Sequence, residues 1–107
     1  MIKHIGPREF LEWRQGGADI TLLDVREDWE VKLSPVPSTT LHIPMGEVSD
    51  RWRELDPAKE TVVICRSGGR SGQVAHFLDR QAFRSVYNLE GGILAWGEEL
   101  DPSIVQY

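Results

Sequence analysis

Two continuous apolar runs stand out in the hydrophobic pattern of the chain. Residues 20–25 (ITLLDV) and 61–65 (TVVIC) are apolar almost throughout and contain several β-branched side chains. Strands that are buried on both faces have this pattern, and such strands are typical of parallel sheets. Shorter runs predict three further strands, at residues 2–5, 41–43 and 85–89.

Segments with helical spacing of apolar residues lie between these strands. A short amphipathic helix is expected from about Pro7, which a first helical turn accepts, to the glycine pair that starts at Gly16. Further helices are predicted at residues 26–33, 46–55, 69–81 and 91–100. Strands that alternate with helices predict an α/β fold with a mostly parallel sheet, helices on both faces and right-handed crossovers.

Length and composition predict an ordinary globular chain. Its 107 residues suit one domain, residues 1–107, and the content of 40% hydrophobic and 27% charged residues is typical of globular proteins. A net charge of −5 argues against nucleic acid or an acidic membrane surface as the main partner. No apolar run reaches the roughly 20 residues that span a bilayer. We also find no secretory signal, so a cytoplasmic location is expected.

A metal site is not expected, and no cofactor is implied. His4, His42 and His76 lie far apart in the sequence, and Cys65 has no neighbouring cysteine or histidine. The single cysteine cannot form an internal disulfide, which agrees with a reducing compartment.

Cys65 follows the second long apolar run, and it has two interpretations. A lone cysteine in such a strand is usually a small buried hydrophobic residue. However, a strand, a glycine-containing loop and a helix start together form a cradle of backbone N–H groups that attracts anions. The candidate loop after Cys65 consists of Arg66, Ser67, Gly68, Gly69, Arg70 and Ser71. Ser71 is also expected to help cap the helix.

This cradle is expected to activate the thiol. A free cysteine has a pKa near ~8.5. A helix terminus contributes at most ~2 kcal/mol, or about 1.5 pKa units, which brings the thiol to around neutrality. Arg66 and Arg70 act in the same direction. The thiolate can then attack phosphorus or arsenic in an oxyanion, or the outer sulfur of thiosulfate.

Four segments resemble the single-domain rhodaneses, a family of thiosulfate sulfurtransferases, in both order and spacing. They are LLDVRE (22–27), LHIPMGE (41–47), VVICRSGGRS (62–71) and VYNLEGGILAW (86–96). The resemblance implies a rhodanese-like α/β fold with a five-stranded sheet in the order 1-5-4-2-3. It also implies that Cys65 is the persulfide-forming nucleophile and that residues 66–70 form the loop around it.

The resemblance extends to residues outside the loop. Asp24 and Arg26, at a neighbouring strand end, are expected to support the loop as a structural ion pair rather than to contact the substrate. Trp96 is expected in the core. The segment before the third strand departs from the family's usual GHIPGA pattern, which affects the rim of the site more than its chemistry.

Loop length separates the two chemistries within the family. Relatives that act on phosphate or arsenate have a C-x5-R spacing, whereas here four residues separate Cys65 from Arg70. The shorter loop favours sulfur transfer. Arg70 can fold back toward the anion, or it can pair with Asp24 or Glu30 and hold the loop.

The leading hypothesis is an enzyme that moves a sulfane sulfur from thiosulfate or a similar small anion to cyanide or a thiol acceptor. The alternative is a sulfur carrier whose persulfide is made and unloaded by protein partners. A phosphatase or arsenate reductase is disfavoured by loop length, and a non-catalytic interaction domain is disfavoured by the presence of the cysteine.

Overall fold

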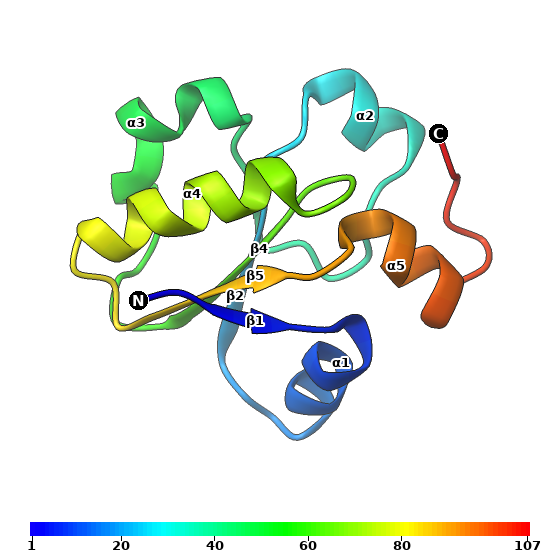
Figure 1. The fold of residues 1–107 in the computed structure, drawn as a ribbon, viewed down its shortest axis with the longest axis horizontal. Helices are drawn as coiled ribbons and strands as arrows, with labels where there is room; N and C mark the ends of the chain where they lie inside the picture. Colours follow the sequence, from blue (N-terminus) through cyan, green and yellow to red (C-terminus); the bar gives the residue numbers. More distant parts are fainter.

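The computed structural model describes residues 1–107 as a five-stranded sheet with helices on both of its faces (Figure 1). The strand order is β1-β5-β4-β2-β3, and every neighbouring pair is parallel. The predicted order is therefore confirmed, and the sheet expected to be mostly parallel is parallel throughout. The strands are β1 (Lys3–Ile5), β2 (Ile20–Asp24), β3 (Leu41–His42), β4 (Glu60–Ile64) and β5 (Ser85–Leu89).

Five α-helices and two short 3-10 helices lie between and after the strands. They are α1 (Pro7–Gln15), α2 (Asp28–Leu33), η1 (Met45–Glu47), α3 (Val48–Arg51), η2 (Trp52–Glu54), α4 (Gly69–Arg80) and α5 (Gly92–Glu99). The single helix predicted at residues 46–55 is wrong, because this segment consists of three short pieces. Arg51 has a φ of −121°, outside the helical range, and ends α3. No helix has the length and apolar character needed to cross a membrane.

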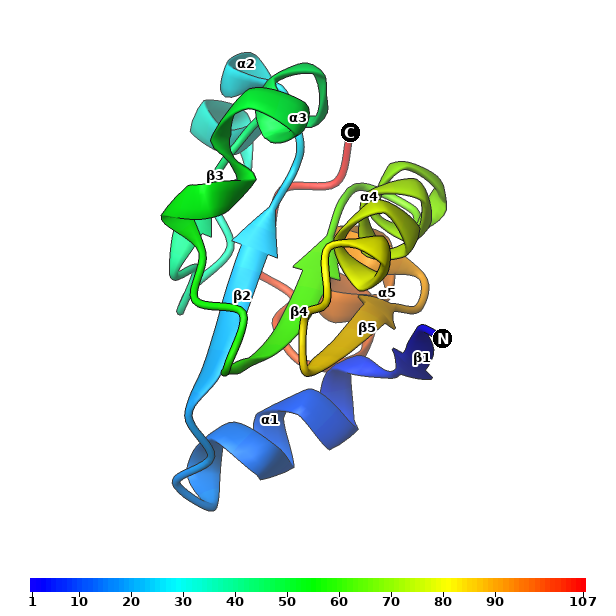
Figure 2. The same ribbon diagram turned by 90° about the vertical axis from the view of Figure 1, so that its left-hand side faces the viewer.

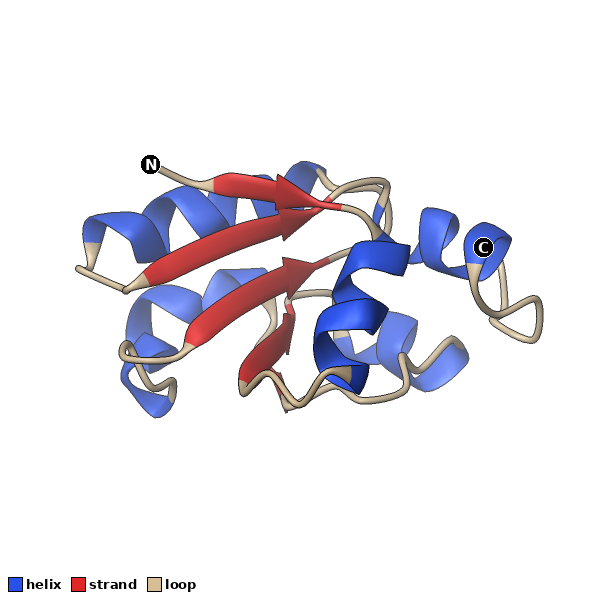
Figure 3. Cartoon of the chain, turned by 90° about the horizontal axis from the view of Figure 1, so that it is seen from below, coloured by secondary structure: helices blue, strands red, loops and turns tan.

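The two central strands explain the long apolar runs, because each strand contributes side chains to two separate cores. Leu23 and Val63 belong to the core beneath α3 and α4, whereas Leu22 and Val62 belong to the core beneath α1 and α5. Successive strand residues point to opposite faces, and here both faces are covered by helices (Figures 2 and 3). Trp96 is 5% exposed in the second core, which confirms its expected position.

The carboxyl ends of β2 and β4 lie side by side. Asp24 pairs with Ile64 in the sheet register, and the N–H of Val25 donates to the carbonyl of Ile64 at 3.1 Å. The C-terminal segment returns to this edge of the sheet, close to α2 (Figures 1 and 2). Ile104 is buried and anchors this segment. The predicted loop and the last residue of the chain therefore meet at one edge.

Candidate active site

Cys65 is the first residue after β4, and its thiol lies inside the loop that follows. The residue is 1% exposed. The N–H of Gly68 donates to Sγ at 3.1 Å, and the hydroxyl oxygen of Ser71 lies 3.3 Å from Sγ. The chain therefore folds back on the sulfur within six residues of it.

Gly68 makes this tight turn possible. Its φ of +107° is in the region that residues with side chains rarely adopt. Gly68 is also the N-cap of α4, which begins at Gly69. The expectation that Ser71 caps this helix is wrong, because Ser71 lies inside the first turn. Its hydroxyl donates to Oδ1 of Asn88 at 2.5 Å instead.

The first turn of α5 supports the loop from the other side. The N–H groups of Ile93 and Leu94 donate to the carbonyls of Cys65 and Arg66 at 2.9 and 3.2 Å. Gly92, with a φ of +56°, is needed at this contact. A Cβ atom at Gly92 would lie 2.5 Å from both carbonyl oxygens. The carbonyls of Cys65 and Arg66 are therefore bound to α5, which leaves the backbone N–H groups of the loop to donate to Sγ.

The environment lowers the pKa of the Cys65 thiol below its ordinary value. Burial raises the pKa, because it disfavours the charged form. The backbone N–H groups of Ser71, Gly68 and Ser67 lower it, and the Ser71 hydroxyl lowers it as well when its proton points to Sγ; together these contacts outweigh the burial. The loop is therefore built to stabilise negative charge at this position.

Arg70 pairs with Glu30 of α2, which is one of the alternatives left open by the sequence. The Nη1 and Nη2 atoms of Arg70 lie 2.6 and 2.9 Å from the two carboxylate oxygens. The Arg70 hydrogen bond holds the pKa of Glu30 at about 2, against the effect of burial and with help from the Glu27 N–H and the Tyr107 hydroxyl. Arg70 therefore ties the start of α4 to α2.

Asp24 and Arg26 form a fully buried ion pair, with Nη2 of Arg26 2.8 Å from Oδ2 of Asp24. The same guanidinium donates to the carbonyls of Glu30 and Ser34 at the end of α2. It also donates to the hydroxyl of Tyr107 at 3.0 Å. Arg26 thus joins the end of β2, helix α2 and the end of the chain, and neither side chain of the pair is open to solvent.

Arg66 lies against the last residue of the chain. Its Nε donates to the backbone oxygen of Tyr107, and its guanidinium is 5.2 Å from the centre of the Tyr107 ring. The Tyr107 hydroxyl donates to Glu30 at 2.7 Å and accepts from Arg26. Tyr107 therefore touches three charged residues at the rim of the loop.

Sequence reasoning missed Asn88 and Tyr107 and considered Glu30 only as a possible partner of Arg70. Asn88 had a usable signal, because it is a polar residue near the carboxyl end of an otherwise apolar strand. Glu30 also had a signal, since it forms a capping box with Glu27 at the start of α2. Tyr107 had none, because the tail has no periodic pattern.

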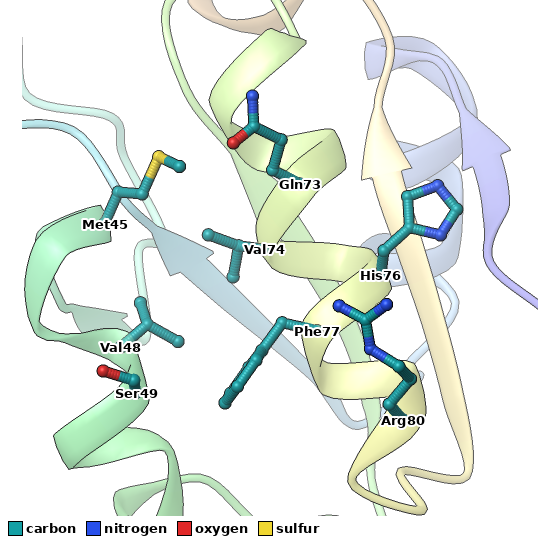
Figure 4. A pocket seen from close by; sticks show the side chains of 8 residues that line it. All are labelled: Met45, Val48, Ser49, Gln73, Val74, His76, Phe77 and Arg80. Atoms are coloured by element: carbon teal, nitrogen blue, oxygen red, sulfur yellow. The ribbon is translucent and has the colours of Figure 1, made fainter.

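A groove of about 520 Å³ lies between the η1–α3 segment and helix α4. Met45 and Val48 face Val74 and Phe77 across it (Figure 4). No residue of the predicted loop lines this groove, so it is separate from the thiol. No group of three or more His, Cys, Asp or Glu side chains is placed to hold a metal ion.

Comparison with known proteins agrees with this geometry. The model of the rhodanese-like domain matches residues 7–99. The putative sulfurtransferase YtwF of Bacillus subtilis is 43% identical over 101 residues, which cover 94% of this chain and 96% of that protein. The thiosulfate sulfurtransferase GlpE of Pseudomonas syringae is 32% identical, and the match covers 97% and 95% of the two chains.

A solved structure supports the same assignment. The crystal structure of a rhodanese-related protein from Thermoplasma volcanium superposes with a TM-score of 0.82 at 31% identity, covering 98% of this chain and 99% of that one. The relatives named for sulfur transfer match nearly the full length of the chain, which supports general sulfur transfer here. With the sheet order, the thiol in its loop and these matches in agreement, the chain belongs to the rhodanese-like domain family.

Proposed function

We propose that the protein is a thiosulfate sulfurtransferase that carries the transferred sulfur on Cys65. The observation that carries this proposal is the contact of 3.1 Å between the Gly68 N–H and Sγ, within a loop that lowers the pKa of the thiol. A thiolate is the reactive form of cysteine. The similarity to GlpE, which is named for thiosulfate, supports the same donor.

The reaction is a double displacement. The Cys65 thiolate attacks the outer sulfur of thiosulfate, the S–S bond of thiosulfate breaks, and its electron pair leaves with sulfite. Cys65 then carries a persulfide whose outer sulfur is the anion. Cyanide or a thiol attacks that outer sulfur, and the electron pair of the persulfide bond returns to Sγ as the thiolate.

The residues around the thiol have distinct roles in this proposal. The N–H groups of Ser67, Gly68 and Ser71 stabilise the sulfur anion, since backbone donors fixed in advance cost no reorganisation during the reaction. Arg66 contributes positive charge at the rim of the loop, Arg70 ties the start of α4 to α2 through Glu30, and Asp24 and Arg26 hold the neighbouring strand end in place. The short C-x4-R loop suits a sulfur atom better than a phosphate group.

Intact mass after treatment with thiosulfate tests the proposal directly. The protein is expected to gain one sulfur atom, and cyanide is expected to remove it with formation of thiocyanate. Because Cys65 is the only cysteine, Cys65→Ser is the matched control and is expected to gain no sulfur. A persulfide that forms but turns over slowly with small acceptors would favour the carrier function. Wild-type protein that gains no sulfur contradicts the proposal.

A further inference from the structure

The side chain of Asn88 reaches the catalytic loop from the neighbouring strand β5. Its amide nitrogen donates to the carbonyl of Gly68 at 3.1 Å, and its amide oxygen lies 2.5 Å from the hydroxyl oxygen of Ser71. Asn88 is only 8% exposed, so water does not compete strongly for these contacts. Asn88 thus touches both ends of the turn that encloses the thiol.

The carbonyl of Gly68 determines which way the Asn88 amide points. A carbonyl only accepts hydrogen bonds, so the NH₂ group of Asn88 faces it and the amide oxygen faces Ser71. If the amide group were flipped, the amide oxygen of Asn88 would face the carbonyl oxygen of Gly68, and neither can donate. The NH₂ group of Asn88 would then face Ser71.

This orientation also determines where the hydroxyl proton of Ser71 lies. Ser71 has one hydroxyl proton, and the oxygen of an amide has none to donate. The short contact of 2.5 Å between Ser71 and Asn88 therefore contains the Ser71 proton. The hydroxyl oxygen then presents only lone pairs to Sγ of Cys65, 3.3 Å away.

A lone pair at this position favours the protonated thiol over the thiolate. The S–H group of Cys65 can donate to the Ser71 oxygen, whereas a thiolate in the same place meets only negative charge density. Ser71 can support the thiolate only if its proton turns from Asn88 to Sγ. The amide oxygen of Asn88 and the thiolate of Cys65 therefore compete for the hydroxyl proton of Ser71.

We propose that Asn88 is a positioning residue that holds the hydroxyl proton of Ser71 away from Cys65 and so limits the acidity of the catalytic thiol. Under this arrangement the backbone N–H groups of the loop, including that of Ser71, stabilise the thiolate, and the Ser71 hydroxyl does not. The proposal deepens the proposed function, because a less acidic thiol gives a more nucleophilic thiolate. It concerns ionisation of the free thiol, however, and can be tested without any sulfur transfer.

The charged and titratable groups around the loop stay the same when Asn88 is changed. The first turn of α5 contributes no acidic residue. The charged or titratable side chains around the thiol come from β2, α2, the loop, the start of α4 and the tail, and they are Asp24, Arg26, Glu30, Arg66, Arg70 and Tyr107. A change in thiol acidity after substitution of Asn88 therefore reports on the Ser71 proton or on the shape of the loop.

The test is the rate of alkylation by iodoacetamide as a function of pH. Asn88→Leu preserves the approximate volume of the side chain and removes its acceptor oxygen. The inflection is expected to fall by about one pH unit, a tenfold change in ionisation. Below the inflection the rate is expected to rise only about threefold, and above it to fall about threefold, because nucleophilicity decreases with the pKa. Asn88→Ala is the second variant, in case leucine prevents folding.

A double-variant comparison separates the Ser71 proton from the shape of the loop. In the Ser71→Ala background the substitution of Asn88 is expected to leave the inflection unchanged, because there is no proton left to release. An equal shift in both backgrounds, or no shift in either, overturns the proposal. Tyr87→Phe, on the same strand but in the other core, is the matched control and is expected to leave the profile unchanged.

The single variant Ser71→Ala gives an independent result. If the Ser71 proton lies on Asn88, its removal is expected to leave the inflection unchanged or to lower it. A raised inflection would mean that the hydroxyl donates to the thiolate, and it would overturn the proposal even if the Asn88 variants did not fold. Because iodoacetamide detects the free thiol, these outcomes are independent of whether thiosulfate is the sulfur donor.

Discussion

The guanidinium of Arg70 and the carboxylate of Glu30 meet in a two-point ion pair, with N–O distances of 2.6 and 2.9 Å. Glu30 is 3% exposed, and its two oxygens also accept hydrogen bonds from the Glu27 N–H and the Tyr107 hydroxyl. Both terminal nitrogens of Arg70 are thus engaged by α2. This geometry favours a role in holding the loop over direct capture of thiosulfate.

Arg70→Ala is expected to lower stability by about 1–2 kcal/mol, because it leaves a buried carboxylate without its main partner while Arg70 itself is partly exposed. Both half-reactions, sulfur loading from thiosulfate and sulfur release to cyanide, are expected to slow by similar factors. Stopped-flow measurement of each half-reaction checks this. An increase in KM for thiosulfate with normal sulfur release would show that Arg70 binds the substrate. Arg80→Ala, on the same helix, is the matched control.

Glu30 is expected to make stability depend on pH in the acidic range. Its folded-state pKa of about 2 lies below the ordinary value of 4.5, so its contribution is fully present above pH 4.5 and is lost as the pH falls toward 2. The shift corresponds to about 3 kcal/mol. Urea unfolding of the wild type and of Glu30→Gln at several pH values checks this. The difference between the two proteins should shrink below pH 4.5, and a constant difference would contradict the interpretation.

Arg26→Met is expected to be among the most destabilising substitutions in the chain. It leaves the buried carboxylate of Asp24 without its partner, and such losses cost about 3–5 kcal/mol. Denaturant unfolding measures the loss. Arg8→Met is the matched control, since Arg8 pairs with Glu99 at the surface and its loss should be far smaller. Equal losses would contradict the role of Arg26 in joining β2, α2 and the tail.

Gly92→Ala is expected to displace the loop around Cys65. The new Cβ would meet the carbonyl oxygens of Cys65 and Arg66 at 2.5 Å. Because these backbone atoms cannot move aside as the end of a flexible side chain can, either the loop or α5 must shift. We expect a loss of more than about 1 kcal/mol in stability and a large decrease in thiocyanate formation. Gly46→Ala is the control, because no atom lies within 4 Å of its Cβ position. Normal activity of Gly92→Ala would show that the contact is dispensable.

Insertion of one glycine between Gly68 and Gly69 tests the argument from loop length. The insertion lengthens the loop around Sγ and changes the C-x4-R spacing to C-x5-R. Sulfur loading from thiosulfate is expected to fall, and competition by phosphate or arsenate for alkylation of Cys65 is expected to appear. Unchanged sulfur loading would mean that loop length does not select the substrate.

The sequence by itself determined the layers of the fold and the place of the candidate nucleophile. Leu22 and Leu23 in β2, and residues 62–64 in β4, are apolar at successive positions because helices cover both faces of the central strands, and this burial leaves a clear local pattern. Gly68, three residues after Cys65, has an equally local reason, since it adopts a φ that other residues avoid. Both features leave a pattern among residues that are adjacent in the chain, so both can be predicted from the sequence.

Only the tertiary structure decided the partners of the loop. Ser71 was expected to cap its own helix, but it meets Asn88, 17 residues away, because β5 lies beside β4 in the sheet. The sequence left Arg70 between the anion site and two carboxylates, those of Asp24 and Glu30. The position of α2 over the strand ends brings Glu30 to it. Tyr107, 77 residues from Glu30, has no local pattern at all. Contacts of this kind arise from the packing of whole elements, which no local periodicity encodes.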